Sequence, residues 1–408
     1  MGRISRIVHR VCVLGALVAA MFIADAGVAQ VGMNMGMGGG AQQVITRREL
    51  DAYSKILSMT PEQFEAAKVL LEGVQAQTRQ LTQDFQKKME AMMEKAQDGD
   101  FGVWQTEMPG HIKVMAEKAK ALETAFYDDI KAILTAEQMV KWPSVERCHR
   151  RTQWTRVGFF SGAGVDLISL VERTKAGEGI MADLTPLLDE YEMKIDDPVQ
   201  AMQRMQEKQT QDYIDGKFNA FDMQAAQNVI KDYAETGKKM RDINREFARK
   251  IISVLPEDRR AGFELEFKRR SFSRVYRETH AQKQFAAAEK FADITPEQKE
   301  SLASVREAYE RDLALANDRW ARAVEEQEEA SGGTFGVMMS GFTGQGASSG
   351  AVGEARQART DLDKRTEERI EAILTAEQRE RLPKKERRQG NPWMDMVDPE
   401  DLAEMQGD

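Results

Sequence analysis

Hydrophobic residues recur along most of the chain at gaps of three and four, which is the spacing of one face of an α-helix. One such stripe consists of Ile112, Met115, Ala119, Leu122, Phe126, Ile130 and Ile133. A second consists of Ala67, Leu71, Val74, Leu81, Phe85, Met89 and Met92. The pattern predicts long amphipathic helices, the first running from Pro61 to about Gln97 over roughly 55 Å.

Short helix-start motifs separate these stripes. The heptapeptide Ala-Ile-Leu-Thr-Ala-Glu-Gln occupies 132–138 and again 372–378. Its threonine is a good N-cap, and the side chain of the glutamine three residues later can return to the N–H of the cap. The predicted capping residues are Leu134, Thr135 and Gln138, Leu374, Thr375 and Gln378, the variants Thr60 with Gln63 and Thr295 with Gln298, and a weaker start at Thr185 that lacks the glutamine.

Glycines mark a second set of breaks, at Gly99, Gly216 and Gly333, in two steps of 117 residues. The segments that follow also align, since Ile130 matches Ile251 and Ile370. The sequence therefore predicts an all-α fold of three tandem, long antiparallel helical hairpins that form a curved array or an oligomer. The predicted repeats cover 46–150, 151–290 and 291–390, and in the middle one the second break reads Leu-Pro-Glu-Asp at 255–258, without the glutamine.

These motifs resemble those of the LTxxQ-motif family of periplasmic stress proteins, the Spy and CpxP type. The resemblance rests on Leu134, Thr135 and Gln138, on the same three residues at 374–378, and on the two variant motifs. It implies an exported, all-helical protein without a cofactor that holds unfolded proteins in the absence of ATP. Family members form cradle-shaped antiparallel dimers and usually carry one such unit, whereas three units are predicted in this chain. The family's dimer therefore does not transfer directly.

The first residues predict an export signal. Arg3, Arg6 and Arg10 precede an apolar run at 11–24, and small residues at 27–29 provide a cleavage site after Ala29. Segment 1–29 is thus a predicted signal peptide, which indicates a protein that is periplasmic or otherwise exported, with no transmembrane segment after cleavage. An uncleaved membrane anchor is the less favoured alternative, because residues 11–24 are too few to span a bilayer comfortably. Loss of three arginines and one aspartate changes the formal charge from −9 to about −11, which disfavours nucleic acid as a partner.

Basic residues cluster after each second break, and we interpret them as candidate client-binding residues in an acidic protein. The alternative is a solvated helix end whose charges complement the helix dipole. The candidates are Arg147, Arg150, Arg151, Lys268, Arg269, Arg270, Lys384, Lys385, Arg387 and Arg388. Expected partners are unfolded or envelope proteins, with a homo-oligomer as a further option.

Two other functions remain open. A metal-responsive module could use the thioethers of Met33, Met35 and Met37 for copper, or Cys148 with His149, although no complete metal site is visible in the sequence. A helical envelope scaffold without a client is the other alternative. Catalytic motifs are absent from the sequence, so we expect no enzyme and no catalytic residue.

Three segments are expected to lie outside the folded core. They are the glycine- and methionine-rich leader 30–45, the glycine- and serine-rich hairpin tip 331–353, and a weakly ordered tail 391–408. Met89, Met92, Met93, Met202 and Met205 are spaced for helix faces. Their flexible thioethers could contact many clients, but we interpret these methionines as core residues because a stripe at helical spacing is ordinarily buried.

Overall fold

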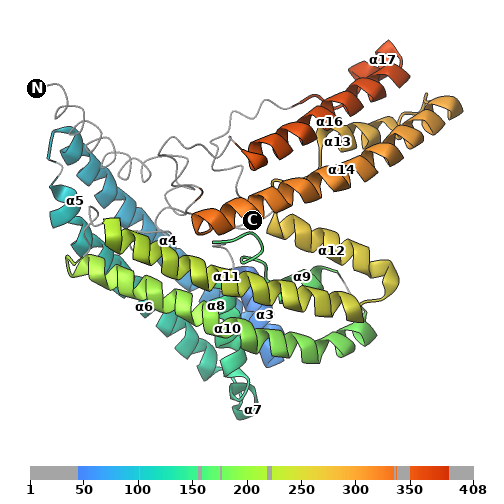
Figure 1. Cartoon of the computed structure of the whole chain (residues 1–408). Coiled ribbons are helices and arrows are strands. Elements are labelled where there is room, and N and C mark those ends of the chain that lie inside the picture. The colour runs from blue at the N-terminus through green and yellow to red at the C-terminus, as the bar shows by residue number, and fades with distance from the viewer. Residues whose placement is uncertain are drawn as a thin grey trace, which may run out of the picture. The chain divides into compact units, whose positions relative to one another are not determined.

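The protein is all-α over the residues that the computed structural model describes, which are 45–100, 102–154, 159–174, 177–217, 223–334, 337 and 350–385. No strand occurs among these residues. The helices (Figure 1) are α3 (Arg47–Leu57), α4 (Pro61–Gln97), α5 (Val103–Thr106), α6 (Met108–Ala132), α7 (Ala136–Met139), α8 (Trp142–Trp154), α9 (Leu167–Arg173), α10 (Glu178–Ile214), α11 (Met223–Val254), α12 (Glu257–Ser271), α13 (His280–Ala288), α14 (Pro296–Ser331), α16 (Ala351–Ile373) and α17 (Ala376–Glu380).

The chain forms two compact units. The first comprises residues 1–154 and 196–226, and the second comprises 155–195 and 227–408. The predicted middle repeat, 151–290, contributes to both units because α10 and α11 each run from one to the other.

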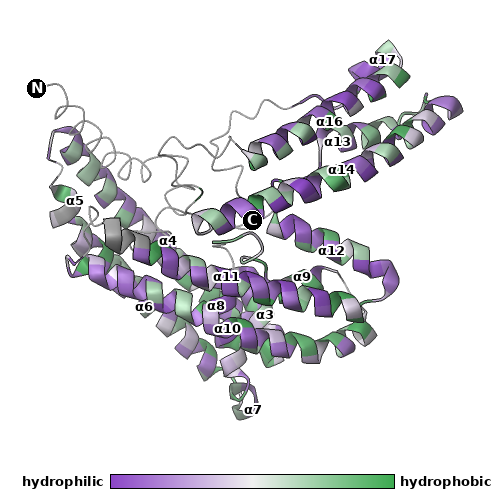
Figure 2. Ribbon diagram, in the orientation of Figure 1, coloured by the Kyte–Doolittle hydropathy of each residue, from purple (hydrophilic) through white to green (hydrophobic). Residues whose placement is uncertain are grey.

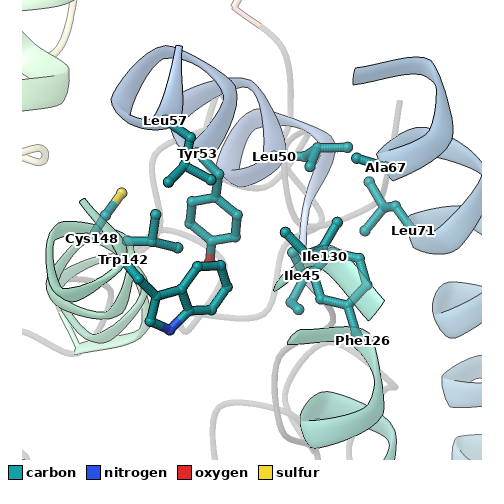
Figure 3. Packing of buried hydrophobic residues seen from close by; sticks show 11 residues of the cluster. Ile45, Leu50, Tyr53, Leu57, Ala67, Leu71, Phe126, Ile130, Trp142 and Cys148 are labelled. Atoms are coloured by element: carbon teal, nitrogen blue, oxygen red, sulfur yellow. The ribbon is translucent and has the colours of Figure 1, made fainter. Parts of the chain in front are cut away.

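The first unit is built on α4 and α6, which pack side by side along their apolar stripes. Lys95 at the end of α4 pairs with Glu107 just before α6, at 2.8 Å, so the two helices run antiparallel. The predicted stripes are confirmed, since Leu71, Phe126 and Ile130 are all buried. In Figure 3, Leu50, Tyr53 and Leu57 of α3 add a further layer, with the Tyr53 ring beside Trp142 of α8.

The second unit contains the helix pair α14 and α16, which Figure 1 shows side by side, with α13 packed against α16. α10 and α11 also meet in this unit, where Lys194 lies 3.4 Å from Glu246 and Lys250 lies 3.3 Å from Glu190. The predicted alignment of the return segments is confirmed in burial, because Ile130, Ile251 and Ile370 are each fully buried.

Most helices are amphipathic rather than uniformly apolar. Figure 2 shows hydrophilic and hydrophobic residues on the same helices, and Met92 and Met202 lie in the core with about 1% of their surface exposed. The interpretation of these two methionines as core residues is therefore confirmed. No helix among the described residues is long and apolar enough to cross a membrane.

The predicted helix start at Thr185 is wrong. Thr185 and Pro186 lie inside α10, and the Thr185 hydroxyl donates to the carbonyl of Met181 at 2.7 Å instead of capping a helix. A proline inside a helix removes one hydrogen bond and costs roughly 3 kcal/mol. The helix continues because Leu184, Leu188 and Tyr191 are buried around this point, and that burial offsets the loss.

The glycine breaks have the geometry that the sequence predicts. Gly99, Gly216 and Gly333 all have positive φ, at 99°, 68° and 90°, a region in which a side chain is strained. Gly333 also lies against the main chain of Phe159, since a Cβ atom added there would be 2.3 Å from the Phe159 carbonyl oxygen. The third break is therefore a packing contact as well as a turn.

Several predicted features lie outside the described residues. These are the signal peptide 1–29, the leader as far as residue 44, and the tail 391–408. Ile45, which was assigned to the leader, is instead buried in the core of the first unit, and its carbonyl accepts a hydrogen bond from Gln75 at 3.0 Å. Of the predicted tip 331–353, the structure describes 331–334, Val337 and 350–353, with α14 ending at Ser331 and α16 beginning at Ala351.

Alanine substitution of Gly333 tests its packing contact with Phe159, and the same substitution of Gly332 is the control. Gly332 has a φ of 75° and no atom within 4 Å of an added Cβ, so Gly332→Ala should cost only the left-handed strain of about 1–2 kcal/mol. Gly333→Ala adds a collision with main chain and should lower the free energy of unfolding by at least about twice as much. Urea unfolding of both variants measures the difference, and equal losses would show that the contact with Phe159 is not formed.

Candidate functional site

The four predicted Thr-x-x-Gln motifs all form complete capping boxes. At the start of α4 the Thr60 N–H donates to Gln63 Oε1 at 2.9 Å, and the Gln63 N–H donates to Thr60 Oγ1 at 3.2 Å. The same pair of bonds occurs at Thr135, Thr295 and Thr375. The capping role assigned to these threonines and glutamines is therefore confirmed.

The two motifs of the first unit also bind each other. Gln63 Nε2 donates to Gln138 Oε1 and Gln138 Nε2 donates to Gln63 Oε1, both at 2.9 Å. The second hydrogen of each amide goes to a main-chain carbonyl, that of Ile133 at 2.7 Å and that of Ser58 at 3.2 Å. We call this reciprocal pair, together with its two carbonyls, a glutamine clasp.

An equivalent clasp closes the α14 and α16 pair. Gln298 and Gln378 exchange amide hydrogen bonds of 2.9 and 3.3 Å. Their remaining amide hydrogens donate to the carbonyls of Ile373 at 2.9 Å and Asp293 at 3.2 Å. Ile373 and Asp293 occupy the positions that Ile133 and Ser58 hold in the first clasp, so the two clasps share one geometry.

A basic residue supports each clasp from the same position, six residues after the threonine. Lys141 Nζ donates to Ser58 Oγ at 3.0 Å in the first clasp. In the second, the Arg381 guanidinium donates to both carboxylate oxygens of Asp293 at 2.7 and 2.6 Å, and this ion pair lowers the pKa of Asp293. These contacts join the residues around the start of α7 to those before α4, and the residues around the start of α17 to those before α14.

The clasp explains why glutamine, rather than glutamate, stands at the third helical position. Either residue completes a capping box, because the box needs only an acceptor oxygen. A glutamine adds two donors, and here both are used while its oxygen accepts from the cap and from the other glutamine. Gln138 and Gln378 are 9% and 1% exposed, and a buried amide is tolerated when its polar atoms are all bonded.

The described part of the predicted middle repeat has no glutamine clasp. α12 begins after Pro256 without a side-chain cap, because proline stands where the other motifs have a threonine hydroxyl that accepts from the helix. The Leu255 carbonyl accepts from Arg260 Nε at 2.8 Å, just as the Leu374 carbonyl accepts from Arg379 Nε at 3.0 Å. This arginine contact at the break is shared with the predicted third repeat.

Sequence reasoning missed a second repeated position, seven residues before each buried isoleucine of the return segments. Glu123, Asn244 and Asp363 occupy it. Asn244 Oδ1 accepts from the Tyr191 hydroxyl at 2.9 Å, and Asp363 accepts from the Tyr309 hydroxyl at 2.7 Å. Burial raises the pKa of Asp363. These three polar residues can be aligned in the sequence, but nothing there distinguishes them from polar residues on the solvent-exposed face of a helix.

Two further capping boxes were also missed, although their sequence signal is present. Thr46 with Glu49 starts α3, and Thr279 with Gln282 starts α13. Both match the Thr-x-x-Glu/Gln pattern but lack the leucine before the threonine. The described contacts of Gln282 are confined to its capping box.

Glu123 belongs to a buried charge cluster around His149. His149 Nε2 lies 2.8 Å from Glu123, and Nδ1 lies 3.4 Å from Glu49 and 3.1 Å from the Tyr53 hydroxyl. Burial alone lowers the pKa of His149, but hydrogen bonds and charge from Glu123 and Glu49 outweigh it and raise the pKa to about 9. His149 is therefore an imidazolium that joins α3, α6 and α8.

The basic residue cluster after the first break is largely engaged within the protein. Arg150 donates to Asp196 through Nε and Nη2, each at 2.9 Å, and Arg147 donates to Ser144 Oγ at 2.8 Å. Arg151 is only 4% exposed. The proposed client contact at Arg151 is therefore wrong, because its side chain does not reach the surface.

The other two clusters also carry internal ion pairs. Lys268 lies 3.2 Å from Glu264, and Arg269 and Arg270 lie 3.9 and 3.3 Å from Glu266. Lys385 pairs with Glu367 at 2.7 Å, and Lys384 is exposed. Arg387 and Arg388 lie outside the described residues.

The described part of the chain contains no group of three or more His, Cys, Asp or Glu side chains placed to hold a metal ion. Cys148 is buried in the core of the first unit, and Met33, Met35 and Met37 lie outside the described residues.

Comparison of the chain with protein-family models, with curated proteins and with solved structures gave no match.

The clasp predicts that replacing glutamine by glutamate lowers stability at Gln138, which is in a clasp, but not at Gln282, which only caps a helix. Gln138→Glu keeps the acceptor for the Thr135 N–H but removes the donors to Gln63 and Ser58, and it should lower the free energy of unfolding by about 1–3 kcal/mol. Gln282→Glu is the matched control, because that glutamine uses only its acceptor in the described contacts, and it should change stability by less than about 0.5 kcal/mol. Similar losses for both variants in urea unfolding would show that the clasp contributes nothing beyond capping.

The His149 cluster predicts a loss of stability in mild alkali. Because the folded pKa of His149, about 9, lies above the ordinary histidine pKa of about 6.5, the stabilisation is complete below pH 6.5 and is lost as the pH rises toward 9. The stability of the wild type relative to His149→Gln should fall across this window by up to about 1.4 kcal/mol per pH unit. A pH-independent difference in urea unfolding would contradict a charged His149.

Proposed function

We propose that the protein is an exported, ATP-independent holding chaperone or envelope-stress protein that binds unfolded polypeptide on its helical surfaces. The observation that carries this proposal is the glutamine clasp, which occurs twice with the same contacts at two complete pairs of Thr-x-x-Gln motifs. The proposal combines this recurrence with the resemblance of the motifs to the LTxxQ-motif family of periplasmic stress proteins.

In this proposal the chain is an array of three divergent helical hairpins, of which the outer two are closed by clasps. Support comes from the antiparallel run of α4 and α6 and from the pairing of α14 with α16. A hairpin of amphipathic helices buries one face and leaves the others for partners, which suits a curved array or a homo-oligomer. Periplasmic localisation rests on the signal sequence at 1–29.

The clasps themselves do not contact a client in this proposal. All the amide hydrogens and both oxygens of Gln63 and Gln138 have partners within the protein, so they have no bonding capacity left for a ligand. Their role is to fix the helix ends. Client contacts therefore come from the remaining surface of the helices, where adaptable apolar side chains favour many partners.

A helical envelope scaffold is the second candidate. The observation that favours it is the internal pairing of the basic residues, above all the two bonds from Arg150 to Asp196 and the short contact between Lys385 and Glu367. Paired charges contribute less to attracting an acidic partner than free ones. In this alternative the same helices would assemble with one another or with an envelope protein and would ignore unfolded chains.

Suppression of aggregation separates the two candidates. Residues 30–408 should prevent the light scattering of reduced α-lactalbumin, without nucleotide, near an equimolar ratio, because holding requires binding rather than turnover. An unrelated acidic helical protein at the same concentration is the control for charge and crowding. Scattering equal to that of the control would reject the chaperone proposal and leave the scaffold, for which static light scattering of the protein alone would report self-association.

A further inference from the structure

The second unit holds a segment of its own chain, residues 159–165, against α11 and the end of α14. The segment contains a turn, in which the Ala163 N–H donates to the Phe160 carbonyl at 2.9 Å. The Phe159 carbonyl accepts from the Thr334 N–H at 2.8 Å. Ser161 donates to the Glu328 carboxylate twice, from its N–H at 2.9 Å and from its hydroxyl at 2.8 Å. Glu328 is 4% exposed, and its burial raises its pKa. The same carboxylate accepts from the Thr334 hydroxyl at 3.2 Å, so this buried group joins the turn to the end of α14.

Helix side chains also bind the main chain of the next residues. Asn244 Nδ2 donates to the carbonyls of Gly162 and Ala163 at 2.8 and 3.1 Å. The Tyr191 hydroxyl, which donates to Asn244 at 2.9 Å, lies 3.4 Å from the Val165 carbonyl oxygen. Asn244 is fully buried. These bonds go to backbone atoms and so fix the course of the main chain, which at Gly162 has a φ of 90°, a region that favours glycine.

The two aromatic side chains of the segment lie against α11. The Phe159 ring stacks on Tyr233 with ring centres 4.8 Å apart, and it fits over Gly237, where an added Cβ would be 2.8 Å from Phe159 Cβ. The Phe160 ring lies 5.1 Å from the Arg241 guanidinium. α11 therefore supplies aromatic, small and cationic surfaces to consecutive phenylalanines.

An open groove continues from Phe160 along the same two helices. Its volume is about 530 Å³, and its apolar lining includes Phe160, Ile230 and Ala234, together with Ala330 at the end of α14. Lys238 and Glu329 line it as well and pair with each other at 2.6 Å. The size falls within the range of roughly 300–1,000 Å³ that is usual for ligand pockets, and the paired charges favour a neutral, apolar occupant.

We propose that this groove binds an aromatic side chain of an unfolded polypeptide. The inference rests on the proposed holding function and names the client chemistry. It follows from continuity, because the groove adjoins a slot in which α11 and the end of α14 already hold two phenylalanines and the turn that carries them. The chain's own Phe159 and Phe160 thus show which side-chain chemistry this surface accommodates.

Fluorescence anisotropy tests the groove directly. The probe is a fluorescein-labelled peptide that copies residues 159–166, with a second peptide in which both phenylalanines are alanine. Ala330→Trp fills the groove from an exposed position, and Ala314→Trp places the same side chain at an exposed position elsewhere on α14. We expect at least tenfold weaker binding for the alanine peptide and for Ala330→Trp, with Ala314→Trp equal to wild type.

Ile230→Ser provides a second test, since it removes apolar lining without adding bulk, and it should also weaken binding of the phenylalanine peptide. Circular dichroism of each variant checks that the helices are intact. Equal affinity of wild type for the two peptides, or equal affinity of wild type, Ala330→Trp and Ile230→Ser for the phenylalanine peptide, would overturn the inference.

The aggregation assay with the same variants separates this inference from the proposed function. Weaker suppression by Ala330→Trp than by Ala314→Trp supports the groove as a client contact. Full suppression by both tryptophan variants overturns the groove as a client contact and leaves the holding function intact. Should wild type itself fail to suppress aggregation, the holding function fails, while groove-dependent peptide binding in the anisotropy assay would still support a site for aromatic segments.

Discussion

The register of the paired helices depends on the bonding of the glutamine clasps. Two amphipathic helices that meet along apolar stripes can slide by one turn, about 5.4 Å, and still place apolar residues against each other. The clasp removes that freedom, because Gln63 and Gln138 satisfy their amides only when the start of α4 lies beside the end of α6. A slip by one turn would leave buried amide groups without partners, at about 1–3 kcal/mol for each.

The predicted middle repeat is joined by other polar contacts. It has no glutamine at its second break, and Tyr191 of α10 donates to Asn244 of α11, whose amide binds the carbonyls of Gly162 and Ala163. Asn244 resembles a clasp glutamine in its chemistry, since its amide donates to two carbonyls and its oxygen accepts from a hydroxyl. The bond between Tyr191 and Asn244 therefore joins α10 and α11 in place of a glutamine clasp, at a position farther from the helix ends.

These locks decide which surfaces remain for partners. Polar residues that looked available in the sequence, such as Arg150 and Arg151, are paired or buried. Large exposed hydrophobic residues occur singly on several helices, apart from Met139 and Val140, and scattered apolar residues are usual on a protein surface. The groove beside Phe160 differs from them because it is concave and adjoins a segment that is already bound.

The sequence by itself determined the local structure of this protein. Apolar spacing predicted the buried stripes of α4 and α6, capping chemistry predicted the starts at Thr60, Thr135, Thr295 and Thr375, and glycines predicted the breaks at 99, 216 and 333. Each of these depends on residues close together in the chain, so a single stretch contains the whole signal. Thr185 failed because burial around Pro186 overrode a local signal.

Only the tertiary structure decided which polar groups meet. Gln63 and Gln138 are 75 residues apart, and Ser161 and Glu328 are 167 apart. Nothing in the sequence around these four residues distinguishes them from residues of the same type that are exposed to solvent. Whether a charge is paired, buried or free depends on what the fold places opposite it, which is why the basic clusters were overestimated and the contacts of Asn244, His149 and Glu328 were missed.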